Sequence, residues 1–214
     1  MRISLDAMIK HEMDKLPRGG DCLNLGSGTK SRYAELLTEM SVSAIDLLPP
    51  PDSLPANWKY YQSTAEQTGF SDASFDLVFS IEVFEHIQNN LAASREVCRV
   101  LKRAGRILLT VPTAYTWPWE FGRHSPHYYT RNSIKYLLES GGMTILSIRT
   151  CGGLGYFVLQ SAKSWLSPIG VRLFGPDRWW RWCDRVLSPL FAVAHILDKF
   201  LPWPPCHFVI TAQK

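Results

Sequence analysis

Three residues in the first quarter of the chain have the types and spacing to bind a nucleoside. Gly26 and Gly28 follow the apolar stretch Cys22–Leu25 and precede an amphipathic stretch. A strand that ends beneath the start of a helix presents unpaired backbone N–H groups, and glycine lets a ligand approach them closely. Asp46 ends the next apolar stretch, about 20 residues beyond the first glycine, where an acid can bind the hydroxyls of a ribose. The pattern predicts a nucleoside-containing ligand; the alternative is a plain surface turn with Asp46 capping the next loop.

The residues after the two glycines narrow the type of nucleoside. A dinucleotide-binding turn has a third glycine at the position where this chain has Ser31. The chain also lacks the glycine-rich loop with a terminal lysine that binds nucleoside triphosphates. A nicotinamide-dependent oxidoreductase is therefore disfavoured, but it stays open as an alternative.

Seven short apolar stretches predict strands, and helical patterns separate several of them. The strands are expected at Cys22–Leu25, Val42–Asp46, Lys59–Ser63, Phe75–Ser80, Arg106–Pro112, Met143–Thr150 and Cys206–Lys214. Helices are expected at Ile3–Leu16, Ser31–Met40, Asn90–Leu101 and Thr130–Glu139. Strands joined by helical crossovers form an α/β, Rossmann-like fold, in which a mostly parallel sheet has helices on both faces. Ligands of such folds bind at the carboxyl ends of the strands. This brings one set of residues to a single rim: Gly26, Asp46, Ser63–Glu66 and Ser80–Glu82.

The composition limits the classes of partner and site. The net charge is +4 and the basic residues are spread along the chain, so we expect no nucleic-acid partner. The five cysteines are widely spaced and form no Cys-x-x-Cys pair, which predicts reduced thiols. Cys183 with His195, and Cys206 with His207, lack the spacing of zinc ligands, so we expect no metal. We find no signal peptide and no apolar stretch of about 20 residues, and we expect a cytoplasmic protein.

Several motifs, in order along the chain, resemble the class I S-adenosylmethionine-dependent methyltransferases. The similar stretches are LNLGSGTKS, AIDL, STAEQTGFSDASFDLVFSIEVFEHI and GRILLTVP. They are most similar to the small methyltransferase-domain branch that also occurs in quinone-pathway and glycan-cluster enzymes. The resemblance implies one domain over residues 1–214, seven strands with the last antiparallel, and S-adenosylmethionine as cofactor. The cofactor-binding residues that it implies are Asn24, Gly26, Ser27, Gly28, Asp46, Leu47, Thr64, Ala65, Glu66 and Ser80.

The resemblance also implies a methyl acceptor. We expect transfer to an oxygen of a small or lipid-linked acceptor, such as a saccharide, a polyprenyl-linked glycan or a quinone-like compound. A hydroxyl acceptor is helped by a base, and His127 and then His124 are the candidates because histidine titrates near pH 7. Their alternative roles are packing or helix capping for one and exposure to solvent for the other. A catalytically silent, membrane-associated protein with the same fold is a further alternative, and the oligomeric state is not indicated.

A tryptophan-rich stretch at residues 155–205 interrupts the alternation before the last strand. It holds five of the eight tryptophans, together with several arginines and prolines. Tryptophan favours places where an apolar surface meets water, and neighbouring arginines suit anionic groups. We expect a helical insert with four open roles: a lid or acceptor site, a membrane-surface element, a dimer contact, or plain packing on the sheet. The membrane role would place the protein at the inner face of a membrane.

Overall fold

The centre of the fold is one seven-stranded sheet. The computed structural model describes residues 3–28, 33–119 and 126–214. The strands run in the order β3-β2-β1-β4-β5-β7-β6, and β7 is antiparallel to both neighbours while the remaining neighbouring strands are parallel. The Rossmann-like sheet with an antiparallel last strand is therefore confirmed. The bounds are β1 (Asp21–Leu25), β2 (Ser41–Asp46), β3 (Trp58–Gln62), β4 (Phe75–Ile81), β5 (Leu101–Pro112), β6 (Thr144–Cys151) and β7 (His207–Gln213).

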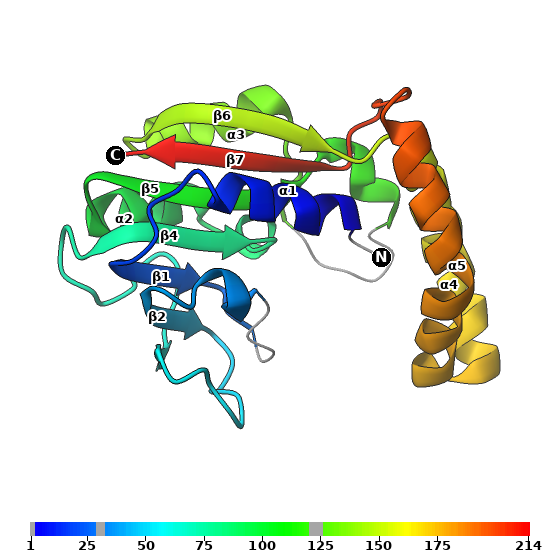
Figure 1. Cartoon of the computed structure of the whole chain (residues 1–214), viewed down its shortest axis with the longest axis horizontal. Helices are drawn as coiled ribbons and strands as arrows, with labels where there is room; N and C mark the ends of the chain where they lie inside the picture. The colour runs from blue at the N-terminus through cyan, green and yellow to red at the C-terminus, as the bar shows by residue number, and fades with distance from the viewer. Residues whose placement is uncertain (1–2, 29–32, 120–125) are drawn as a thin grey trace.

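Helices cover both faces of this sheet, as Figure 1 shows. On one face, α2 (Asn90–Val100) and α3 (Arg131–Ser140) bury aliphatic side chains such as Val97 and Leu138 against the strands. On the other face, α1 (Ile3–Met13) does the same with Leu5 and Ile9. The alternation of apolar residues along each strand supplies both cores, since successive side chains point to opposite faces.

Local signals fix where α2 and α3 begin. The Asn89 side chain accepts a hydrogen bond from the Ala92 N–H at 3.1 Å and caps α2. At the start of α3, the Thr130 hydroxyl accepts from the Ser133 N–H at 3.1 Å, and the Ser133 hydroxyl accepts in return from the Thr130 N–H at 2.9 Å. Both helices agree with the sequence prediction, because these caps satisfy the N–H groups that a helix start leaves unpaired.

The helix expected over Ser31–Met40 is wrong in the part that the structure describes. Only the short 3-10 helix η1 (Ala34–Leu36) forms there, directly after Tyr33, whose φ of 65° is left-handed. A non-glycine residue in this region interrupts a right-handed helix. The amphipathic pattern still identifies the buried side chains of this segment, because Tyr33, Leu37 and Met40 lie in the core beneath α1.

The tryptophan-rich stretch forms two long helices, α4 (Leu154–Phe174) and α5 (Pro176–Asp198), joined at Gly175. They pack side by side as a hairpin that projects from one end of the sheet in Figure 1. The base of α4 also packs on the 3-10 helix η3 (Ala114–Trp119), which follows β5. Among the described helices, none has an apolar stretch of the length that crossing a bilayer requires.

Candidate cofactor-binding site

A cavity of about 520 Å³ lies at the carboxyl ends of β1, β2 and β4. β1 and β4 are neighbours in the sheet although two strands separate them in sequence, so this is the point at which the strand order reverses. Ligands of open α/β sheets bind at this point. The cavity is lined by Leu25, Gly26, Ile45, Asp46, Leu47, Ser63, Thr64, Ala65, Glu66, Glu82, Val83, His86, Ile87 and Gln88. Its volume is within the usual range for small-ligand sites, about 300–1,000 Å³.

The glycine turn after β1 forms the floor of the cavity mouth. The N–H groups of Gly26 and Ser27 both donate to the Ile45 carbonyl, at 2.9 and 3.1 Å, which ties the turn to β2. Gly26 has a φ of 73°, and a Cβ there would lie 2.7 Å from Cγ1 of Val83. Only glycine fits such a position without strain, because the conformation is left-handed and the neighbouring side chain occupies the space.

Asp46 is held in place at the end of β2 by two backbone donors. Gly28 donates to Oδ2 at 2.8 Å, and Leu48 donates to Oδ1 at 3.1 Å. Each carboxylate oxygen can accept a second hydrogen bond, so the group remains able to bind hydroxyls. The structure thus joins Gly28 and Asp46, which lie 18 residues apart, at one edge of the cavity.

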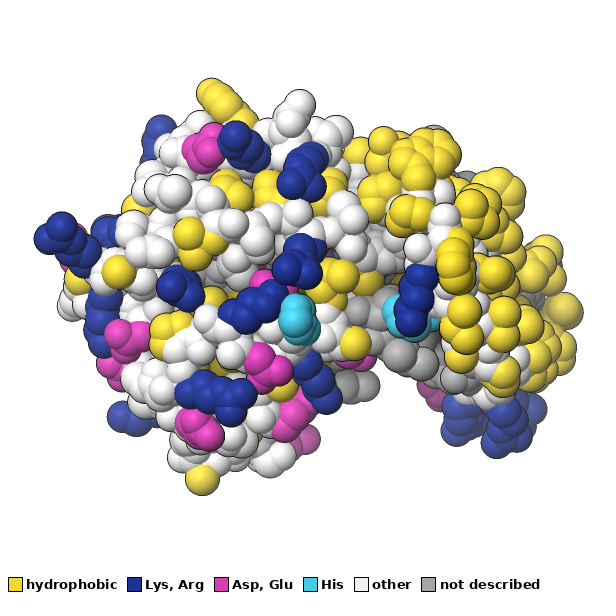
Figure 2. Space-filling model, turned by 45° about the horizontal axis from the view of Figure 1, so that its top comes forward, with side chains coloured by type: hydrophobic (Ala, Val, Ile, Leu, Met, Phe, Trp, Pro, Cys, Tyr) yellow, Lys and Arg dark blue, Asp and Glu magenta, His cyan; other side chains and the backbone are white. Residues whose placement is uncertain are grey.

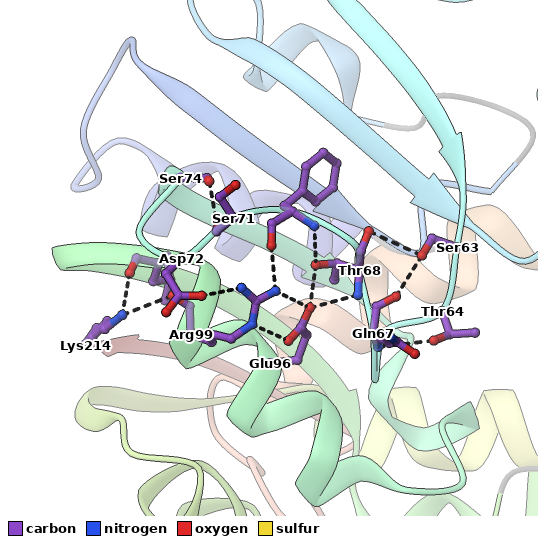
Figure 3. Close-up of polar contacts among 12 residues, drawn as sticks. Ser63, Thr64, Gln67, Thr68, Ser71, Asp72, Ser74, Glu96, Arg99 and Lys214 are labelled. Atoms are coloured by element: carbon purple, nitrogen blue, oxygen red, sulfur yellow. Dashed lines mark hydrogen bonds and ion pairs between the residues drawn. The ribbon is translucent and has the colours of Figure 1, made fainter.

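A network behind the cavity wall positions the segment Ser63–Thr68, as Figure 3 shows. Glu96 of α2 accepts from both the N–H and the hydroxyl of Thr68, at 2.8 and 2.6 Å. Arg99 donates to the same carboxylate at 2.8 Å and pairs with Asp72 on the other side. The Arg99 guanidinium lowers the pKa of Glu96 to about 2, with further lowering by the two Thr68 donors, although burial opposes the shift. Glu96 is therefore an anion at neutral pH and anchors the wall.

A family model described as a methyltransferase domain matches residues 23–109, which run from β1 into β5. Residues 23–109 thus carry the methyltransferase domain that the motifs predicted, with S-adenosylmethionine as the cofactor of such a domain. No curated protein matches the chain by sequence.

Solved structures share the fold of this methyltransferase domain at low sequence identity. The [4+2]-cyclase SpnF superposes with a TM-score of 0.68 at 16% identity, covering 98% of this chain and 80% of its own. Phosphoethanolamine N-methyltransferase 2 of Haemonchus contortus, solved with S-adenosyl-L-methionine, gives 0.64 at 16% identity over 98% of this chain and 52% of its own. An S-adenosylmethionine-dependent methyltransferase of Mesorhizobium loti gives 0.62 at 15% identity over 96% and 95%. These similarities show the fold alone, since one of the three is a cyclase.

The structure brings most of the predicted cofactor residues to the cavity of the methyltransferase domain. Six of them line it: Gly26, Asp46, Leu47, Thr64, Ala65 and Glu66. Ser27 and Gly28 lie in the adjoining turn. Asn24 and Ser80 are buried within β1 and β4 and are not among the lining residues. Ser80 Oγ has no hydrogen-bond partner within the described part of the chain.

The two histidines predicted as bases differ in what the structure says of them. His124 lies outside the described residues. His127 is half-buried beside the cavity wall. Its backbone N–H donates to the Glu85 carbonyl at 3.3 Å, and its ring Nε2 lies 3.1 Å from the Gln88 carbonyl. Because a carbonyl can only accept, we assign the ring proton to Nε2, which leaves Nδ1 as an acceptor.

The sequence placed Glu82 on the rim of the site, but it did not indicate that Glu82 contacts His207. Glu82 follows β4, lines the cavity and has a left-handed φ of 57°. Its Oε1 accepts from the Thr110 hydroxyl at 2.9 Å, and its Oε2 lies 3.2 Å from Nδ1 of His207, the first residue of β7. The pair joins residues far apart in sequence, so no local pattern could indicate it. A strained residue beside a cavity is typical of functional sites.

Proposed function

We propose that this methyltransferase binds S-adenosylmethionine in the cavity and transfers its methyl group to an oxygen of a small or lipid-linked acceptor. The observation that carries the proposal is the held carboxylate of Asp46 at the edge of the cavity, joined to the glycine turn through the Gly28 N–H at 2.8 Å. An anchored acid beside a glycine turn suits a ribose next to an amino-acid tail. The proposed roles are ribose binding by Asp46, adenine contact by Thr64–Glu66 and close approach of the methionine part at Gly26.

Positioning is the main task of the protein in the proposed reaction. When bound, S-adenosylmethionine would supply a methyl group on a positively charged sulfur, with S-adenosylhomocysteine as the leaving group. The residues of the cavity would orient the acceptor hydroxyl towards that methyl group, and a base would take the hydroxyl proton. His127 Nδ1 is the proposed base, because it is an acceptor on a residue fixed to the cavity wall through Gln88. Glu82 is the second candidate, because it lines the same cavity and its carboxylate accepts a hydrogen bond from the Thr110 hydroxyl.

A lipid-linked acceptor is supported by the path from the cavity to the hairpin. His207, which contacts Glu82, also faces Tyr156 of α4 with ring centroids 6.2 Å apart. Tyr156 in turn packs against Phe191 of α5 at 5.4 Å. The aromatic base of the hairpin thus adjoins the same rim as the cavity. We propose that the apolar part of an acceptor lies along this base while its hydroxyl enters the cavity.

Replacing Asp46 by Ala tests the cofactor role. We expect S-adenosylhomocysteine to bind more weakly by about 1–3 kcal/mol, the range for removing a charged hydrogen-bond partner. This corresponds to a dissociation constant raised about 5- to 150-fold in isothermal titration calorimetry. Asp52→Ala is the matched control, since Asp52 is exposed in the following loop and does not line the cavity. Unchanged affinity in Asp46→Ala, or tighter binding of NAD than of S-adenosylhomocysteine by the wild type, would contradict the proposal.

Replacing His127 by Ala tests the base. Turnover is measured as S-adenosylhomocysteine release with free saccharides, polyprenyl-linked saccharides and quinols as acceptors. We expect turnover to fall by about 10²- to 10⁴-fold, the usual contribution of a general base, while cofactor affinity is unchanged. His11→Ala, on the exposed side of α1, is the control. Full activity of His127→Ala would exclude it as the base and leave Glu82, and activity lost only in Glu82→Gln would assign the role there.

A further inference from the structure

The hairpin of α4 and α5 has a well-packed inner face. Trp179 of α5 lies so close to Gly170 of α4 that a Cβ on the glycine would approach Cζ3 of the indole to 2.5 Å. At the other end, Asp198 accepts from the Gly155 N–H at 2.8 Å, and Leu154 donates to the Leu201 carbonyl at 3.0 Å. The two helices are thus held together at both ends, and their remaining faces point away from this contact.

The outer faces carry continuous apolar stripes. Side chains spaced at three, four or seven residues lie on one side of a helix. On α4 these are Leu154, Val158, Trp165, Ile169 and Leu173, each 41–69% exposed. On α5 they are Trp182, Val186, Leu190, Val193 and Leu197, each 42–55% exposed. Phe200 and Trp203 continue the surface at 77% and 67%. Monomeric proteins rarely expose apolar patches of such extent unless another surface covers them.

Basic side chains accompany these stripes. Residues 154–203 hold six basic and three acidic residues, a net charge of +3 out of +4 for the whole chain. Four exposed arginines lie on the hairpin: Arg172, Arg178, Arg181 and Arg185. The acid Asp198 is buried where α5 meets the start of α4. Figure 2 shows hydrophobic side chains over the hairpin and Lys or Arg side chains gathered at its far end. The surface is therefore apolar and positively charged together.

We propose that the α4–α5 hairpin docks on the surface of a bilayer that contains anionic lipids. The charge decides between this partner and a second copy of the chain. A second copy would bring like-charged arginine clusters to a shared interface, and Asp177 is the one exposed acid among the described hairpin side chains. Anionic headgroups instead neutralise the arginines, while the stripes and the exposed tryptophans enter the boundary between headgroups and acyl chains. The hairpin lies in the surface and does not cross it, which agrees with the absence of a spanning helix among the described residues.

The full-length protein is tested by co-sedimentation with vesicles of phosphatidylcholine alone and of phosphatidylcholine with 30% phosphatidylglycerol. The anionic lipid gives the second type of vesicle a negative surface potential, which attracts Lys and Arg side chains. We expect binding to the anionic vesicles, and weaker binding as salt rises. Ile169→Ser/Leu173→Ser/Val193→Ser and Arg172→Glu/Arg178→Glu/Arg181→Glu are each expected to lower the vesicle affinity at least about tenfold. Tyr136→Ser/Leu146→Ser and Lys59→Glu/Arg103→Glu/Arg131→Glu are the controls, since they change exposed residues elsewhere and should bind like the wild type.

Each result distinguishes this proposal from the proposed function. The hairpin variants are expected to bind S-adenosylhomocysteine as the wild type does, which also shows that they fold. A wild type that stays in the supernatant with both vesicles overturns the docking proposal, and so do hairpin variants that bind vesicles normally. A wild-type dimer that becomes monomeric in the serine variant, without vesicle binding, overturns it in favour of a second copy. Failure to bind S-adenosylhomocysteine overturns the proposed function and leaves vesicle docking intact.

Discussion

Gly26→Ala is expected to abolish binding of S-adenosylhomocysteine and to destabilise the fold. The residue has a φ of 73°, and the left-handed conformation costs an alanine about 1–2 kcal/mol. Its Cβ would lie 2.7 Å from Cγ1 of Val83, and overpacking of this kind costs about 1–3 kcal/mol more. Because Val83 lines the cavity, the displacement that relieves the contact moves it where the ligand must lie. Urea unfolding should show a loss of about 2–5 kcal/mol, and calorimetry no heat of binding.

Two further variants separate the cost of the left-handed backbone at Gly26 from the cost of a Cβ that overlaps Val83. Gly69 has a φ of 80° and nothing within 4 Å of an added Cβ, so Gly69→Ala should show the strain alone and bind the ligand normally. Val83→Ala in the Gly26→Ala background removes the colliding methyl groups and should restore part of the stability. If Gly26→Ala binds S-adenosylhomocysteine with wild-type affinity, the close approach at this turn plays no part in cofactor binding.

Glu96→Ala is expected to loosen the wall of the cavity and to lower stability by about 2–4 kcal/mol. The change removes the acceptor of two Thr68 groups, the buried backbone N–H and the side-chain hydroxyl. It also removes one of the two carboxylates that pair with Arg99. Since Ser63–Thr68 is one continuous segment, affinity for S-adenosylhomocysteine should fall as well. Glu39→Ala is the control, because Glu39 is exposed and lies on the opposite face of the sheet from Glu96. Unchanged unfolding in urea at pH 7 would show that the network does not stabilise the protein.

The same carboxylate predicts how stability depends on pH. Arg99 and Thr68 lower the pKa of Glu96 from its ordinary value of 4.5 to about 2 in the folded protein. A lowered folded-state pKa contributes stability above pH 4.5, and this contribution is lost as the pH falls from there towards about 2. The free energy of unfolding should therefore fall less in Glu96→Gln than in the wild type between about pH 5 and about pH 3. Urea unfolding at these two pH values measures the difference. Parallel losses in the two proteins would assign the acid sensitivity to other groups.

Local sequence patterns predicted the parts of this methyltransferase domain that depend on neighbouring residues. The central strands β1, β4 and β5 could be located because apolar runs buried on both faces are distinctive in a parallel sheet. The edge strands β3 and β6 are partly exposed, and β-branched and aromatic residues indicated them instead. Gly26 and Asp46 could be singled out because a tight turn and a strand-end acid each have a local signature. Both line the predicted cavity.

Parts of the site that depend on contacts across the fold could not be predicted in this way. Glu82 and His207 meet only because β7 inserts between β5 and β6, and the Glu96 anchor needs α2 to lie beneath the loop after β3. In its described part, the helix expected over Ser31–Met40 is absent for a local reason that the periodicity does not show, the left-handed φ of Tyr33. Periodicity reports which side chains are buried, and here it identified the buried face while misassigning the backbone.

The register of β6 with β7 has a consequence for how this protein can diversify. Cys151 at the end of β6 is paired directly with His207 at the start of β7, so the whole hairpin leaves the sheet and returns to it at one point. In topological terms the hairpin is an oversized connection between two adjacent antiparallel strands, which a tight turn of a few residues could replace. Lengthening, trimming or exchanging this appendage leaves every strand pairing of the sheet in place. The surface that the hairpin presents can thus change while the strands that frame the cavity stay the same.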